Sequence, residues 1–239
     1  MTVSRFKLDV RMLRELLREP YLETIKEPGF WNYHCIGMHV MSLLRTPALS
    51  IKLYFFNEQH PTFSAESPVN DDGYIVNPHD HRYPFQQWVL KGAMTNFIFK
   101  QHTSENAHGL RGPSWSMREF NPVTKEWSAV LRAGIRMEVE AHPLMQGDSY
   151  WLDTDQIHTL GRVEPGTILL TFQYAADASR SVTYLPTGEP LPFQSGPAGL
   201  RGGDALMYYI PLPPSDRKRL AERARRAVQQ LIWYGHDRR

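Results

Sequence analysis

The feature of the sequence that most constrains its fold is a series of short β-favouring runs with no helical pattern between them. From Leu49 to about Tyr174, β-branched and aromatic residues recur in short segments separated by turn residues. Ten candidate strands result, at residues 50–56, 73–76, 86–91, 94–99, 115–120, 126–132, 135–141, 149–152, 158–163 and 167–174. Such strands favour an antiparallel sandwich or barrel over a parallel α/β sheet. The sequence therefore predicts a mainly β protein.

Helical periodicity is found at both ends of the chain. Apolar residues between Phe6 and Leu17 fall on one face, and Pro20 ends that pattern. A second helical or mixed stretch is expected around residues 30–44. We therefore expect a helical N-terminal extension over 1–48, a barrel core over 49–174, and a Pro- and Gly-rich wrapping segment with a C-terminal helix over 175–239. With 239 residues, all of this fits a single domain spanning 1–239.

Composition excludes several classes of protein. Hydrophobic residues make up 41% of the chain, but no apolar run approaches the roughly 18 to 20 residues of a membrane helix. Cys35 is the only cysteine, which excludes an internal disulfide and a cysteine-based zinc or iron–sulfur cluster. We expect a reducing, cytoplasmic compartment.

The net charge of +2 conceals a basic C-terminal segment. Arginine and lysine cluster between Ser215 and Arg239, whereas the rest of the chain is slightly acidic. Such a cluster can contact nucleic-acid phosphates. In the same segment, however, Leu220, Ala224 and Val228 recur at helical spacing, which predicts an amphipathic helix with a solvated basic face. This interpretation disfavours a nucleic-acid partner.

Two histidines lie two residues apart in the segment that runs from Gly73 to Gly92. In a strand, positions i and i+2 point to the same side, so His79 and His81 would project together while Asp80 faces away. Two imidazoles on one face supply half of a metal site. On its own, the pattern also describes a pair of surface or hydrogen-bonded histidines.

A second stretch, from Gly147 through His158, completes a known pattern. The cupin superfamily has a first motif G-x5-H-x-H-x3or4-E-x6-G and a second motif that begins with a glycine and ends with a histidine and an asparagine. The chain resembles this family, because the first motif's spacing is matched by Gly73, His79, His81 and Gly92, and the second motif's by Gly147 and His158. The resemblance covers about residues 49–174. It implies a double-stranded β-helix, the cupin or jelly-roll barrel, with the helical ends outside it.

The departures from the cupin motifs bear on the chemistry. Phe85 or Gln86 stands where the family has its glutamate, depending on the gap counted, so no carboxylate is supplied. The ligand set implied is then His79, His81 and His158, similar to the three-histidine cupins that include the cysteine dioxygenases. This resemblance implies Fe(II), with other divalent metals left open. The Cys–Tyr crosslink of those dioxygenases is not expected, because Cys35 lies far upstream of the first motif.

Four further residues are candidates for contact with a substrate. Arg162 follows His158 by four residues, hence on the same expected strand face, and is a candidate to bind a substrate carboxylate; the alternative is a salt bridge at the rim. Gln86 and Gln87 are candidates to line the cavity. Tyr174 is a candidate for proton transfer, against the alternative of a buried tyrosine satisfied by a neighbour.

Three classes of function follow. The leading hypothesis is a mononuclear non-haem Fe(II) enzyme that uses O2 to oxidise a small polar metabolite. The second is a lyase or isomerase in which the metal acts as a Lewis acid. The third is a non-catalytic cupin that binds a small ligand. The partners expected are a small-molecule substrate and O2, without a membrane or nucleic acid, and a homodimer is left open.

Overall fold

The computed structural model describes residues 8–26, 29–33, 37–56, 74–102, 114–121, 126–176, 180–187 and 210–236. Three helices lie at the two ends of the chain: α1 (Val10–Leu16), α2 (Glu19–Glu23) and α3 (Pro214–His236). The described strands are β1 (Gly29–Trp31), β2 (Met38–Arg45), β3 (Leu49–Phe56), β4 (Phe85–Lys91), β5 (Ala93–His102), β6 (Trp115–Asn121), β7 (Glu126–Trp127), β8 (Arg132–Met145), β9 (Ser149–Leu152), β10 (Ile157–Gly161), β11 (Ile168–Tyr174), β12 (Ser181–Pro186) and β13 (Ile210–Pro211).

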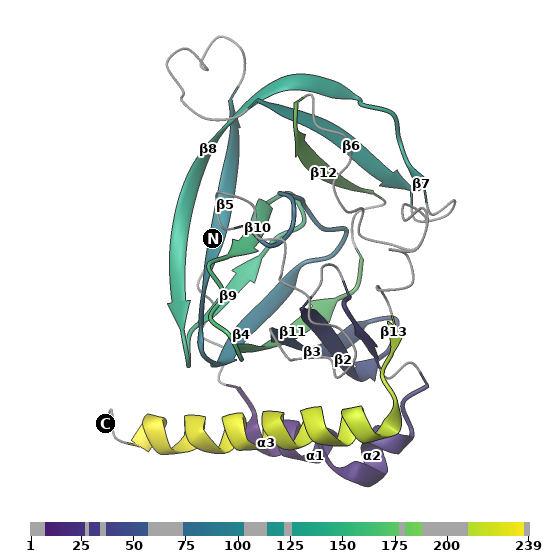
Figure 1. The fold of residues 1–239 in the computed structure, drawn as a ribbon, viewed down its shortest axis with the longest axis vertical. Coiled ribbons are helices and arrows are strands. Elements are labelled where there is room, and N and C mark those ends of the chain that lie inside the picture. Colours follow the sequence, from purple (N-terminus) through teal and green to yellow (C-terminus); the bar gives the residue numbers. More distant parts are fainter. Residues whose placement is uncertain are drawn as a thin grey trace.

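The strands form two antiparallel sheets that face each other across the barrel (Figure 1). One sheet has the order β13-β1-β2-β3-β11-β4-β9 and the other β10-β5-β8-β6-β12. Tyr74 and His79 make isolated bridges to Gly161 and His158, so this segment runs beside β10 at the edge of the second sheet. The chain thus passes repeatedly from one sheet to the other, which is the arrangement of a double-stranded β-helix. The expected cupin-type fold is confirmed.

The three helices pack together against one face of the first sheet, at the bottom of the view in Figure 1. Leu220, Ala224 and Val228 of α3 are fully buried there, as their helical spacing predicted. The Trp31 indole nitrogen of β1 donates to Asp216 Oδ2 at 3.0 Å, which ties the sheet to the start of α3. Within the described part of the chain, no helix is long and apolar enough to cross a membrane.

The opposite face of the first sheet forms the interior of the barrel. Because successive strand residues alternate between faces, Ile51, Leu53 and Phe55 of β3 point toward the helices, whereas Tyr54 and Phe56 point into the barrel. The same alternation holds in β4, where Leu90 joins the helix-side core while the interior receives Phe85 and Val89. This division decides which polar side chains can reach the histidines.

Two expectations about the flanking segments were wrong. Residues 30–44 were predicted to be helical or mixed, but β1 and β2 lie there and extend the first sheet, so the helical extension ends with α2. A short apolar run buried on both faces has no period that separates strand from helix. The segment after 175 was predicted to wrap without regular structure, yet it contains β12, which pairs with β6. Gly73 and Cys35 lie outside the described residues.

Gly92 is required where β4 of the first sheet turns into β5 of the second. Its φ is +79°, and a Cβ added there would lie 2.4 Å from Thr167 Oγ1 and 3.0 Å from Thr167 Cα. Gly134 has a similar φ of +72° but open space around the added atom. The two glycines therefore share the backbone constraint, and only Gly92 adds a steric one.

We predict that Gly134→Ala lowers the free energy of unfolding by about 1–2 kcal/mol through its backbone alone. Gly92→Ala is expected to lower it by at least about 1 kcal/mol more, because the methyl group must displace Thr167. Urea titration of the two variants measures the difference. Equal losses would contradict the steric role of Gly92.

Candidate metal centre

Three histidines converge at the edge of the second sheet. His79 and His158 form an antiparallel backbone pair, with His79 N to His158 O at 2.9 Å and His158 N to His79 O at 2.8 Å. Residues directly opposite each other in such a pair carry their side chains on the same face. His81 follows after the bridge, outside any strand, and one ligand nitrogen from each of the three lies within 4.8 Å of the others. The clustering of the three histidines is confirmed, although strand parity is not what positions His81.

Hydrogen bonds to oxygen acceptors orient two of the three rings. His79 Nδ1 lies 2.8 Å from the Asn77 carbonyl oxygen, and His158 Nδ1 lies 2.8 Å from Asn96 Oδ1. Because these oxygens only accept, each Nδ1 carries the hydrogen and each Nε2 keeps its lone pair. His81 Nε2 is 2.9 Å from His158 Nε2. The lone pairs of His79 and His158 are therefore held ready for a metal by the rest of the fold.

Burial favours the neutral form of the His79 and His158 imidazoles. Burial lowers the pKa of His79, although its bond to the Asn77 carbonyl partly opposes this. Burial, and then the proximity of His79, holds the pKa of His158 well below its ordinary value. A neutral imidazole is the form that binds a metal.

Among the residues that the structure describes, no carboxylate joins the cluster as a ligand. Asp80 faces away, as expected, and its Oδ1 accepts a hydrogen bond of 2.7 Å from Val182 N in β12. Burial raises the pKa of that carboxyl to about 6. The apolar ring of Phe85 packs beside the cluster, with its centroid 4.8 Å from that of His81 and 5.5 Å from that of His158.

The donor set fits a divalent transition-metal ion. Two nitrogens bound to one ion at about 2.0–2.1 Å and near right angles lie about 3 Å apart, close to the 2.9 Å between His81 and His158. Three imidazoles, two of them with their outer nitrogens bonded to protein oxygens, are typical of sites for Fe, Zn, Cu or Ni and untypical of Mg or Ca sites. The residues present therefore suit the implied metal.

The structure does not bring Arg162 to the histidines, which corrects the assumption of a common strand face. Strand β10 ends at Gly161, and Arg162 has a φ of +48°, so the alternation that would carry its side chain inward is broken. The side chain is exposed, and its guanidinium lies 5.5 Å from the centre of the Phe97 ring. Phe97 belongs to a separate core on the opposite face of β5 from Ile98, the register partner of His158. A substrate-binding role for Arg162 loses its structural basis.

Tyr174 and Gln86 are not directed at the histidines either, because they lie on the side of the first sheet that faces the helices. The Tyr174 ring packs 5.1 Å from that of Trp151, whose strand neighbours Tyr150 and Leu152 point into the barrel. Gln86 is the register partner of Trp151, so it shares that outer face. The proposed roles of Tyr174 in proton transfer and of Gln86 in substrate contact therefore have no support from the geometry.

Gln87, by contrast, faces the interior. Its Nε2 donates to Thr171 Oγ1 at 2.7 Å, and its Oε1 accepts from the hydroxyl of Tyr150, a residue with no exposed surface. Burial raises the pKa of Tyr150 far above its ordinary value, so this hydroxyl stays a donor. Gln87 remains a candidate to line the site.

Two interior polar residues were missed by the sequence interpretation. Asn96 is fully buried and accepts from His158, and Lys52 of β3 lies on the interior face. A sequence signal could have marked them, because each is a polar residue within a strongly apolar strand. Neither belongs to a motif, which is why spacing alone did not mark them.

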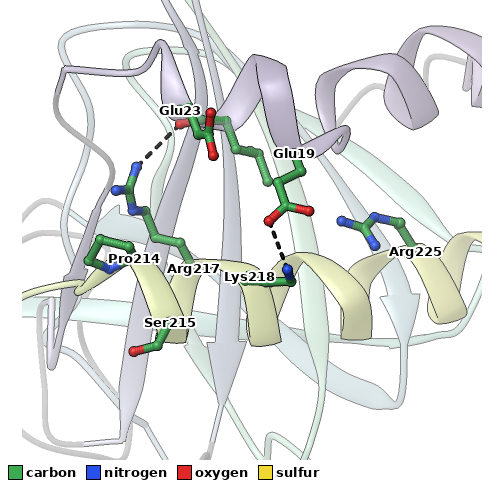
Figure 2. Close-up of a pocket in the computed structure, with 8 residues that line it drawn as sticks. Glu19, Glu23, Pro214, Ser215, Arg217, Lys218 and Arg225 are labelled. Atoms are coloured by element: carbon green, nitrogen blue, oxygen red, sulfur yellow. Dashed lines mark hydrogen bonds and ion pairs between the residues drawn. The ribbon is translucent and has the colours of Figure 1, made fainter.

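A pocket of about 210 Å³ between α2 and α3 is a separate feature (Figure 2). An ion pair between Glu19 and Lys218 at 2.8 Å spans it, and Arg217 donates to the Leu22 carbonyl at 3.2 Å. These contacts tie the two helices to each other. We assign the pocket to helix packing.

Comparisons with known proteins give only distant likenesses. KdgF from Halomonas sp. is 16% identical with a TM-score of 0.30, and the match covers 59% of this chain and 82% of that one. Pac13, a nucleoside dehydratase from Streptomyces, is 10% identical with a TM-score of 0.35, covering 68% of this chain and 88% of that one. HEPD from Streptomyces albus, solved with Fe(II), is 12% identical with a TM-score of 0.33, covering 62% of this chain and 24% of that one.

No protein-family model and no curated protein matches the sequence. At the identities and TM-scores of these structural matches, none of them carries an argument about function. The topology and the site geometry therefore carry the functional argument.

We predict that His158→Ala loses bound metal, because it removes the central ligand nitrogen of the cluster. The matched control is His102→Ala, at the end of β5, where the His102 Nε2 atom lies 3.2 Å from Glu138 Oε2. Elemental analysis of both purified proteins provides the measurement, with close to one divalent ion per chain expected in the control. Retention of the metal by His158→Ala would refute the three-histidine metal site.

A second prediction concerns the orientation of His158. Asn96→Ala removes the acceptor of the His158 Nδ1 hydrogen and is expected to weaken metal binding by about 10- to 100-fold. Thr95→Ala is the control, since Thr95 is the next residue on the same strand and points to the opposite face. Competition with a metal-binding dye measures both affinities, and equal values would show that Asn96 does not position the ligand.

Proposed function

We propose that the protein is a mononuclear non-haem Fe(II) enzyme that uses O2 to oxidise a small polar metabolite, in the manner of the three-histidine cupins. The observation that carries the proposal is the set of three converging imidazoles with no carboxylate among them. Three protein ligands on one side of an ion leave positions for a chelating substrate and O2 together. The Fe(II) identity comes from the resemblance to cysteine dioxygenase-like cupins.

The chain's own residues prepare the site in three ways. Asn77 and Asn96 hold the outer nitrogens of His79 and His158, which fixes the direction of the two Nε2 lone pairs. Phe85 packs against two of the rings and keeps water from that side of the cluster. Bound Fe(II) would supply the capacity to bind O2 and to exchange electrons with a coordinated substrate. Because the ligands are neutral, the ion's full charge is left to attract an anionic substrate.

A redox-neutral lyase or isomerase is the second candidate. The same neutral donor set suits a metal that acts as a Lewis acid on a bound carbonyl or carboxylate. Oxygen consumption separates the two candidates, because only the oxygenase uses O2 in each turnover. Binding of a ligand with no turnover would favour a non-catalytic role.

We predict substrate-dependent O2 uptake by the Fe(II)-loaded protein when small carboxylates and amines are supplied, measured with an oxygen electrode. The Zn(II)-loaded protein is expected to show none, because Zn(II) has no accessible redox change. His158→Ala is expected to show none either. Product formation under strictly anaerobic conditions, or equal turnover with Zn(II), would refute the oxygenase proposal in favour of the lyase.

A further inference from the structure

Lys52 is a charged residue on the interior face of the barrel. It lies between Ile51 and Leu53, which point to the helix side, and on the same face as Tyr54 and Phe56, which belong to the interior core. Its side chain is half-buried. Placing a lysine ammonium on such a face carries a desolvation cost that a merely structural position would avoid.

Two neighbours hold the ammonium in place. Lys52 Nζ donates to Gln173 Oε1 at 2.8 Å and lies 5.8 Å from the centre of the Tyr33 ring. Among the residues that the structure describes, its partners are therefore an amide and an aromatic face, with no carboxylate to neutralise it. The lysine keeps a net positive charge available to an anion.

The sheet register links this charge to a residue that packs against the histidines. Gln173 is the register partner of Phe85, whose ring packs against His81 and His158. Lys52 itself lies on one row with Thr171 and Gln87, so two strand spacings, about 10 Å, separate its backbone from that of β4. A substrate that joins Lys52 to the histidines has to bridge these two strand spacings.

A continuous line of half-buried side chains joins the two groups. The Tyr83 ring lies 5.2 Å from His81, and Tyr33 is close enough to Tyr83 to contribute, after burial, to raising its pKa. The half-buried strip consists of His79, His81, Tyr83, Tyr33, Lys52 and Gln173. Beneath it, Phe85 and Tyr54 are buried. Solvent therefore reaches the strip, whereas the layer below is closed.

We propose that Lys52, positioned by Gln173 and Tyr33, binds the carboxylate of the substrate, while the other end of that molecule reaches the three-histidine centre. This inference rests on the proposed function for the metal end and on the strip alone for the carboxylate end. A carboxylate is favoured over a phosphoryl group, because one point-charge lysine and one amide neutralise a monoanion better than a dianion. The aromatic rings between the two ends suit an apolar body, so the substrate class is a small, partly apolar carboxylic acid.

The test is a titration of the Zn(II)-loaded protein with benzoate, followed by calorimetry, because zinc allows binding without oxidation. Lys52→Met keeps the length and removes the charge, and it is expected to weaken benzoate binding by about 10- to 100-fold. Lys52→Arg should recover part of the loss. Lys91→Met, an exposed lysine at the end of β4, is the matched control and should bind benzoate like the original protein. If Lys52→Met fails to fold, Lys52→Gln replaces it.

Three outcomes would overturn the inference. The first is equal benzoate affinity with and without the Lys52 charge. The second is binding of the neutral analogue benzamide as tightly as benzoate, or of phenylphosphonate more tightly. The third is a loss of binding in Arg82→Met but not in Lys52→Met, which would transfer the role to the arginine beside His81.

The same titration on metal-free protein separates this inference from the proposed function. A Lys52-dependent affinity for benzoate without any metal binding or O2 uptake would support the carboxylate site and refute the oxygenase. Oxygen uptake that Lys52→Met leaves unchanged in both KM and kcat would support the oxygenase and refute the carboxylate site.

Discussion

The backbone pair between His79 and His158 is the contact on which the rest of the site depends. Its two hydrogen bonds join a segment with little regular structure of its own to β10, a strand buried along its whole length. His79 and His158 are 79 positions apart in the sequence, yet their backbone pairing places both imidazoles on one face. His81 then needs only to follow His79 by two residues to complete the cluster.

The alternation of side chains between the two faces of each strand determines which other residues face the interior of the barrel. In the first sheet, one set of positions packs under the helices and the other set faces the histidines. Gln87 belongs to this interior set and bonds to Tyr150, while Asn96 lies on the interior face of β5 in the second sheet and bonds to His158. Lys52 belongs to the same set, so the sheet that builds the core also carries a charge toward the centre.

Much of this arrangement could be predicted from the sequence where residue spacing and local geometry agree. The histidine spacings predicted the cluster, and the structure produces it through the backbone pair of His79 and His158, with His81 following two residues after His79. The face of α3 was predicted from apolar periodicity, since burial of that face is what stabilises the helix. Gly92 was a match to a motif, and the structure supplies its reason in the close approach of Thr167.

The rest depended on facts that no local pattern contains. Arg162 was placed by counting from His158, but a single positive φ after the strand end redirects it to Phe97. Tyr174 and Gln86 required knowledge of which face of β11 and β4 meets the helices. The strand at 38–45 forms a hairpin with β3, and the strand at 29–31 pairs with it and with β13, which lies far along the chain, so pairing within the sheet overrides local preference.

Anomalous X-ray scattering from crystals of freshly purified, untagged protein tests the central claim most directly. Data collected above and below the iron absorption edge should show one peak, present only above the edge, among the Nε2 atoms of His79, His81 and His158. A peak at the zinc or copper edge instead would keep the metal centre and contradict iron. No anomalous peak among these nitrogens, in protein that elemental analysis shows to contain metal, would contradict the three-histidine centre itself.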